Sequence, residues 1–161
     1  MYNTYAFFSL YANIDSFCFS EKIVPIKKRP EIDKWVLSEL NTLIIATTNF
    51  YDNYEPTKVC RLISKFVIDD LSNWYVRLSR RRFWKGSYEE DKIAAYQTLY
   101  ECLIVVSKIM APVAPFYSEM LYRDLNGFTK KEKSISVHLA KFPHPNESLI
   151  DKKLEARMQT C

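Results

Sequence analysis

The chain has 161 residues, 48% of them hydrophobic and 26% charged, and its 23 basic and 19 acidic residues give a net charge of +4. This length and composition fit one globular domain, or one domain with a short appendage. Only two residues are glycine and no glycine-rich phosphate-binding motif occurs, which excludes dinucleotide folds and phosphate loops, whose backbone must approach phosphate closely. Because the tight turns of β-sandwiches and barrels also depend on glycine, the expected fold class is mainly all-α.

The N-terminal segment, residues 1–29, is expected to be a linking helix followed by a basic connector. Residues 1–19 are rich in aromatic and aliphatic side chains but lack the basic start and small-residue cleavage site of a signal peptide. Their apolar residues recur at helical spacing, which predicts a helix packed on another part of the protein. A membrane-surface helix is the alternative, but such a helix needs basic residues on its polar face, and none precedes Lys22.

Residues 30–126 are expected to form an antiparallel helical bundle. Apolar residues at three- and four-residue spacing predict long helices at 30–52, 56–85 and 88–110 and a shorter one at about 116–125. Pro30 and Pro56 suit the first position of a helix, and short connectors favour antiparallel neighbours. The predicted core-facing stripe of the second helix includes Val67, Leu71, Trp74 and Leu78.

The helix ends and the tail carry their own signals. Gly86 is the residue type that favours a helix C-terminus, and Ser87 to Glu90 matches a capping box for the third helix. Residues 127–161 are expected to form a C-terminal tail. Alternating apolar residues within 134–142 predict a short strand there, and an amphipathic helix follows at about 148–158.

No group of residues predicts catalysis or metal binding. The sequence lacks a defensible Ser/His/Asp constellation, and the adjacent Asp69 and Asp70 would point about 100° apart on a helix. The four cysteines form no C-x-x-C pair, so we interpret them as buried or incidental thiols of a reducing cytosol. His138 and His144 have no cysteine nearby, so zinc is not expected.

The segment that points to a function is strongly basic. Residues 77–85 carry five positive charges and no negative one, and no arginine among them has an acid three or four residues away. A helix C-terminus that offsets the helix dipole is one interpretation. RNA contact is the other, because guanidinium groups bind phosphates and aromatic rings stack on unpaired bases. The candidate RNA-binding residues are Asn73, Arg77, Arg80 and Trp84 along one helical stripe, and Arg81, Arg82 and Lys85 beside it, toward the core.

Several segments together carry a family resemblance: Asn3 to Tyr5, Leu10 to Asp15, Asp33 to Leu37, Asp70 to Arg77, Arg80 to Trp84, Ala95 to Tyr100, Met110 to Phe116 and Ser136 to Leu139. Through them the chain resembles the anticodon-binding helical domain of class I aminoacyl-tRNA synthetases, specifically the isoleucyl enzymes. The run Asp-Leu-Ser-Asn-Trp-Tyr-Val-Arg at 70–77 is the most specific of them. Two positions depart from the family pattern, Met1 where tryptophan is usual and Ser16 where glycine is common.

The resemblance implies a module that recognises the anticodon stem-loop of an isoleucine-accepting tRNA, in the cytoplasm and without a membrane, with the rest of a synthetase as its other partner. Catalysis in this family needs ATP and Mg and the motifs His-Ile-Gly-His and Lys-Met-Ser-Lys-Ser. Neither motif occurs here, so no enzyme activity and no cofactor are expected of this chain. The alternatives are a helical adaptor that binds protein, or the equivalent domain of a leucyl or valyl enzyme.

Overall fold

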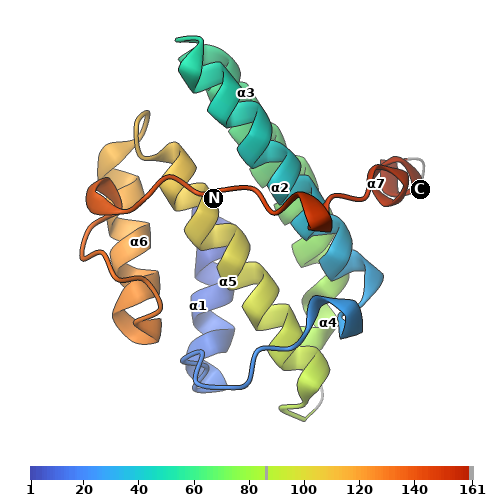
Figure 1. The fold of residues 1–161 in the computed structure, drawn as a ribbon. Helices are drawn as coiled ribbons and strands as arrows, with labels where there is room; N and C mark the ends of the chain where they lie inside the picture. The colour runs from blue at the N-terminus through green and yellow to red at the C-terminus, as the bar shows by residue number, and fades with distance from the viewer. Residues whose placement is uncertain (86, 160–161) are drawn as a thin grey trace.

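The computed structural model describes residues 1–85 and 87–159, and these residues form helices joined by turns and loops (Figure 1). In chain order the elements are α1 (Tyr2–Ile14), the 3-10 turn η1 (Ile26–Lys28), α2 (Glu31–Asp52), α3 (Pro56–Lys65), the π-helix η2 (Phe66–Val76), α4 (Arg77–Trp84), α5 (Glu90–Met110), α6 (Pro115–Thr129), the 3-10 turns η3 (Val137–Leu139) and η4 (Glu147–Leu149), and α7 (Lys152–Gln159). No strand occurs in the described residues. The prediction of an all-α fold is confirmed.

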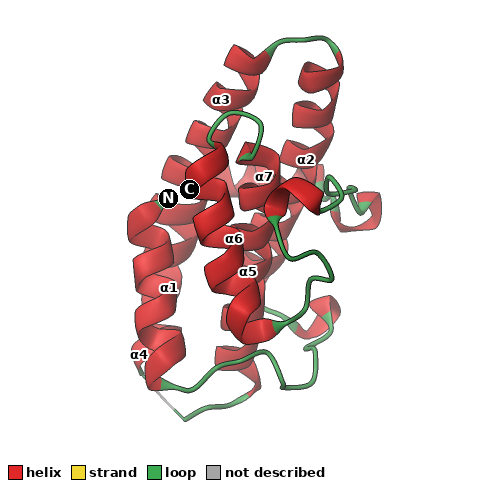
Figure 2. Cartoon of the chain, turned by 90° about the vertical axis from the view of Figure 1, so that its left-hand side faces the viewer, coloured by secondary structure: helices red, strands yellow, loops and turns green. Residues whose placement is uncertain are grey.

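The long helices pack around α5, which contacts α1, α2, α3, α4 and α6. In Figure 1, α2 and the continuous helix α3–η2–α4 lie side by side and run in opposite directions, joined by a short turn. Figure 2 shows the same bundle from the side, with the segment between α1 and α2 crossing its lower end. One hydrophobic core includes Phe8 of α1, Leu103 of α5 and Leu154 of α7. The core therefore includes residues of all three predicted segments, 1–29, 30–126 and 127–161. The division of the chain at residues 29 and 126 stays a prediction.

The sequence located the long helices well but misplaced some of their ends. Pro30 has a ψ of 158° and precedes the first turn of α2 as its N-cap, whereas Pro56 does stand at the start of α3. The capping box is wrong: Glu89 is the N-cap of α5, and the Ser87 hydroxyl donates to the Glu89 carboxylate. Gly86, expected to end the preceding helix, lies outside the described residues.

The helix expected over 56–85 is continuous, but its middle part is the π-helix η2. This change of hydrogen-bonding pattern alters which side chains face the core. A π-helix closes i→i+5 hydrogen bonds and therefore holds more residues per turn than an α-helix. The predicted core stripe is correct at Val67 and Leu71, but beyond them the inward positions move by one residue. Tyr75 and Ser79 are buried, while Trp74 is half-buried and Leu78 is exposed. The expectation that Leu78 lies in the core is wrong for this reason.

Helix α5 is long and apolar enough to cross a membrane, but 72% of that stretch is buried inside the bundle. This burial is typical of the core helix of a globular fold.

Helix α1 contains no charged residue and packs Phe8 and Ala12 into the core. Just after it, Ser16 has a φ of 56°, in the left-handed region that glycine adopts most easily, and the family resemblance had pointed to glycine at this position.

The predicted strand within 134–142 is wrong. Val137–Leu139 is a 3-10 turn. Of the three apolar residues that alternate here, Val137 is buried, while Ile135 and Leu139 are exposed. The backbone N–H of Val137 donates to the Glu119 carboxylate of α6 at 2.8 Å, so a side chain takes the place of a neighbouring strand as hydrogen-bond partner. The alternating apolar pattern was therefore misleading, because the segment folds as bends and a 3-10 turn.

The tail ends in α7, which docks on α2 through a buried carboxylate. Glu155 accepts hydrogen bonds from the hydroxyls of Ser38 and Thr42 and from Lys152. Burial alone would raise the pKa of Glu155, but these hydrogen bonds have the larger effect, so its pKa is lowered from the ordinary value.

Nearby, burial and the charges of Glu155 and Asp70 raise the pKa of Glu39 to about 7. One oxygen of Glu39 is buried with no hydrogen-bond partner among the described residues.

Candidate nucleic-acid interface

The basic residues of the candidate interface lie on α4 and on the η2 residues that lead into it. Two buried side chains fix α4 against the bundle: Ser79 and Phe83. The Phe83 ring packs edge-on against Phe7 of α1 and Tyr96 of α5, with centroids 5.1 Å away in both cases. With these positions turned inward, most of the candidate residues are left on the outer face.

Six of the seven candidate residues are exposed: Asn73, Arg77, Arg80, Arg81, Trp84 and Lys85. No ion pair involves Arg77, Arg80, Arg81 or Lys85 within the described part of the chain. The Trp84 side chain is 56% exposed, so it does not pack in the core. We name these six residues the outer face of α4.

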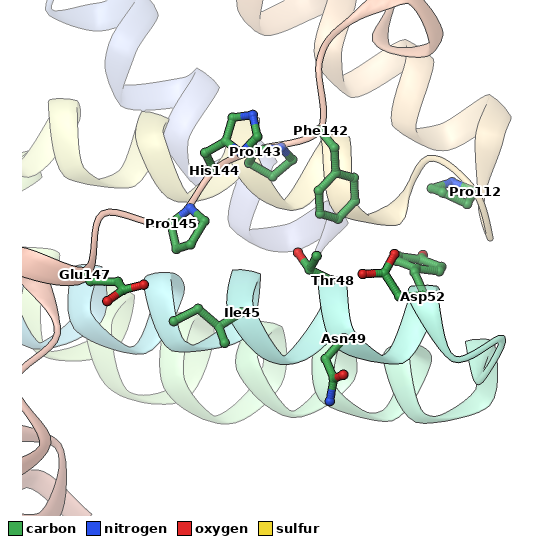
Figure 3. A pocket seen from close by; sticks show the side chains of 11 residues that line it. Ile45, Thr48, Asn49, Asp52, Pro112, Phe142, Pro143, His144, Pro145 and Glu147 are labelled. Carbon is green, nitrogen blue, oxygen red and sulfur yellow. The ribbon is translucent and has the colours of Figure 1, made fainter.

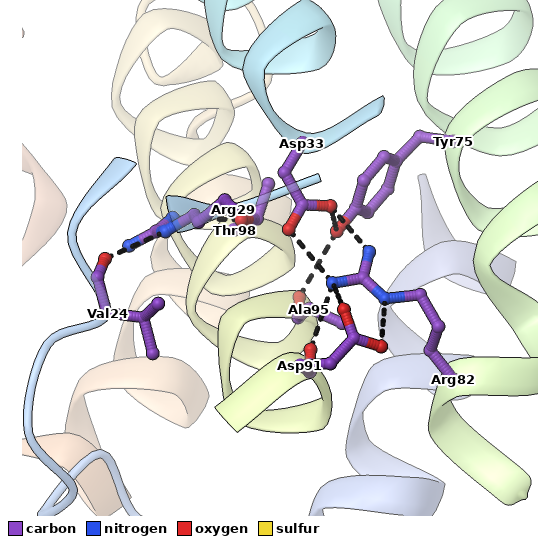
Figure 4. Close-up of polar contacts among 8 residues, drawn as sticks. All are labelled: Val24, Arg29, Asp33, Tyr75, Arg82, Asp91, Ala95 and Thr98. Atoms are coloured by element: carbon purple, nitrogen blue, oxygen red, sulfur yellow. Dashed lines mark hydrogen bonds and ion pairs between the residues drawn. The ribbon is translucent and has the colours of Figure 1, made fainter. Parts of the chain in front are cut away.

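Arg82 is the exception, because it points into the bundle (Figure 4). Its Nη1 and Nη2 donate to the two Asp33 oxygens at 2.6 and 3.0 Å, and its Nε donates to Asp91 at 3.0 Å. Asp33 is fully buried and also accepts a hydrogen bond from the Tyr75 hydroxyl at 3.0 Å. We name Asp33, Tyr75, Arg82 and Asp91 the inner seam.

The electrostatics of the inner seam hold its charges in place. Burial disfavours the charge of Arg82, but the hydrogen bonds and the charge of Asp33 outweigh it, so its pKa is raised. Burial and the charge of Asp33 raise the pKa of the Tyr75 hydroxyl. Arg82 therefore stays a cation and Tyr75 a hydrogen-bond donor at any physiological pH. The ion pair between Arg82 and Asp33 was not predicted from the sequence, because the two residues are 49 positions apart in the chain.

A second buried arginine holds the basic connector. Arg29 donates from Nε to the Val24 carbonyl at 3.0 Å and from Nη1 to the Thr98 hydroxyl at 2.9 Å (Figure 4). The Gln97 side-chain oxygen accepts from the backbone N–H of Val24 at 2.9 Å. The connector is therefore bound across α5, and Arg29 is not available to a ligand.

A cleft lies between α1 and the outer face of α4. It has a volume of about 270 Å³ and is lined by Asn3, Thr4 and Phe7 of α1 and by Ser72, Asn73, Val76, Arg77 and Arg80. The Arg80 guanidinium lies over the Phe7 ring, 5.9 Å from its centroid. Three predicted residues, Asn73, Arg77 and Arg80, thus meet at one site. The α1 residues were missed, because helical periodicity on one segment says nothing about which other helix lies beside it.

A larger groove, of about 780 Å³, lies between α2 and the segment 142–147 (Figure 3). Its walls include Ile45, Phe142 and three prolines, and its charged residues are the acids Asp52 and Glu147. Carboxylates repel phosphates, so this groove does not suit a nucleic acid. His144 lines it as well, yet no group of residues that could hold a metal ion occurs in the described ranges.

The outer face has the chemistry that RNA binding requires. Exposed arginine and lysine side chains neutralise phosphates, and an exposed ring such as that of Trp84 can stack on an unpaired base. The six residues of the outer face include no carboxylate, histidine or thiol.

Comparison with known proteins identifies the family of the chain. Residues 33–161 match the family described as the anticodon-binding domain of tRNA ligase. Over 99% of the chain, the sequence is 59% identical to the isoleucine–tRNA ligase of Bacteroides fragilis, of which the match covers 14%. The corresponding proteins of Porphyromonas gingivalis and Thermus thermophilus are 58% and 42% identical over 99% of the chain, which covers 14% and 15% of their lengths. The chain thus spans about one seventh of the length of these relatives.

Proposed function

The chain belongs to the anticodon-binding domain family of tRNA ligases, and from this premise we propose that it binds the anticodon stem-loop of a tRNA through the outer face of α4. Phosphate contacts would supply the affinity, and contacts to unstacked loop bases the sequence preference. The proposed contact residues are Asn73, Arg77, Arg80, Arg81, Trp84 and Lys85. Arg82 is proposed as a positioning residue, which holds α4 in place from the inner seam.

One observation carries this proposal: among the residues that the structure describes, four cations of the outer face have no carboxylate partner, while the neighbouring Arg82 is bound by two carboxylates. If these three arginines and Lys85 served only to offset the helix dipole, nothing would require all four to stay exposed beside an exposed tryptophan. Unpaired cations at this density favour a polyanionic ligand.

The identity of the relatives supports a tRNA that accepts isoleucine, within a larger synthetase that uses ATP and Mg in other domains. The matches do not favour an adaptor or a leucyl or valyl domain. We propose that this chain alone is not catalytic and acts in the cytoplasm as part of such an enzyme. The purified chain should accordingly show no isoleucine-dependent exchange of pyrophosphate into ATP, and measurable exchange would contradict this.

The binding proposal is tested by titrating the chain with a panel of tRNAs over a range of salt concentrations. Three or four phosphate contacts on a single-stranded loop predict a log–log slope of about −2 to −3. Binding of an isoleucine-accepting tRNA in preference to the others, with this slope, is the expected result. Affinity that is independent of salt would mean that phosphates are not the ligand.

A further inference from the structure

The cleft between α1 and the outer face contains polar groups that the protein itself does not use. The side chains of Asn3, Thr4, Ser72 and Asn73 make no hydrogen bond within residues 1–85 and 87–159. Thr4 is only 3% exposed, and Asn3 and Asn73 beside it are exposed. A ligand that enters this cleft would therefore meet two side-chain amides that can both donate and accept hydrogen bonds.

The lining also has flat and charged surfaces in a useful arrangement. The Arg80 guanidinium covers the Phe7 ring, and a planar guanidinium offers a face on which a base can stack. Arg77 is exposed at the same cleft and can reach a phosphate. The lining thus offers two amides for the edge of a base, the Arg80 guanidinium for its face, and the charges of Arg77 and Arg80 for a phosphate.

We propose that this cleft holds one unstacked nucleotide of the bound RNA, with its base edge on Asn3 and Asn73 and its phosphate on Arg77 and Arg80. This inference rests on the proposed function and specifies where one base is read. Amide side chains both donate and accept, which suits the edge of a base and is not needed for phosphate alone. The lining contains no carboxylate, so a basic peptide is a poorer fit.

The test uses the whole chain and two exposed positions, so that folding is preserved. Asn3→Ala and Asn73→Ala should each weaken binding of an anticodon stem-loop RNA by about tenfold, without changing the salt slope. Asn13→Ala is the matched control, because Asn13 is also an exposed amide on α1 but lies outside the cleft. It should bind as the wild type does.

A set of stem-loops with one abasic nucleotide each then identifies the base. Removing the bound base should weaken wild-type binding by about tenfold, and Asn73→Ala should add no further loss with that RNA. At every other loop position the two losses should multiply. Wild-type binding with unaltered affinities of both asparagine variants would overturn the nucleotide site alone. Failure of the wild-type chain to bind any tRNA would instead overturn the proposed function, and this inference with it.

Discussion

The inner seam and the outer face of α4 use the same residue type for opposite purposes. Arg81 and Arg82 are adjacent, yet Arg82 lies between Asp33 and Asp91, while Arg81 is exposed and has no ion pair with any residue in 1–85 or 87–159. The difference comes from the helices opposite, because α2 and α5 each bring a carboxylate to the Arg82 side of α4. An arginine in a basic run can therefore be assigned a role only when its neighbours from distant segments are known.

The largest effect should come from breaking the inner seam. Arg82→Ala leaves the fully buried Asp33 with the Tyr75 hydroxyl as its main partner, and loss of one member of a buried ion pair typically costs about 3–5 kcal/mol. Because the Arg82 side chain is 15% exposed, we expect about 3 kcal/mol, measured by urea unfolding at pH 7. Arg81→Ala is the control and should change stability by less than about 0.5 kcal/mol. Equal effects of the two substitutions would remove the distinction between seam and face.

The outer face should respond in the opposite manner. Replacing Arg80 and Arg81 together by alanine should reduce the salt slope of tRNA binding by about one to two, since two phosphate contacts are lost. The free energy of unfolding should stay within about 0.5 kcal/mol of wild type. Should the double variant bind tRNA as tightly as wild type at every salt concentration, the RNA surface lies elsewhere.

Trp84 tests the outer face without changing charge. Its side chain is 56% exposed, so Trp84→Ala should lower tRNA affinity by about 1–3 kcal/mol through lost base stacking and leave the salt slope unchanged. Melting followed by circular dichroism should change little. A large drop in melting temperature with unchanged affinity would show that the ring packs rather than stacks.

Glu39 extends the comparison to a half-buried acid whose pKa is raised by burial and by the charges of Glu155 and Asp70, although the charges of Lys65 and Lys152 act to lower it. Its pKa of about 7 exceeds the ordinary value of 4.5, so between these values the folded protein binds more protons than the unfolded chain. Stability therefore falls as the pH rises from about 4.5 to about 7. Glu39→Gln removes this penalty and should raise the free energy of unfolding by about 1 kcal/mol at pH 8, a figure reduced for solvent screening because Glu39 is half-buried.

At pH 5 the same substitution should have a much smaller effect, since Glu39 is then protonated in the folded protein and the pH is only just above its ordinary pKa of 4.5. Glu147→Gln, at an exposed acid, is the control and should show no pH-dependent difference. Equal gains at pH 5 and pH 8 would mean that the ionisation of Glu39 is not the cause.

The sequence predicted those parts of the fold that depend on local pattern. Helices α2 and α5 follow from apolar residues repeated at three- and four-residue spacing, and a basic face on α4 follows from the charges alone. The strand at 134–142 was mispredicted, because alternation does not reveal that Glu119 of another helix binds the backbone of Val137. The ion pair of Arg82 and the contribution of α1 to the cleft could not be predicted for the same reason, because each brings together residues that lie far apart in the chain.

The π-helical segment η2 makes the orientation of α4 depend on the number of residues before it. Each residue of an α-helix turns the chain by about 100°, so deleting a single residue within 66–76 would rotate all of α4 relative to the bundle. Ile68 is exposed, and its replacement by alanine would remove little packing. Its deletion, by contrast, would carry Arg82 away from Asp33. Along this stretch chain length is a stricter constraint than composition: substitutions on the exposed side are tolerated, while an insertion or deletion of one residue turns the inward side of α4 away from the core.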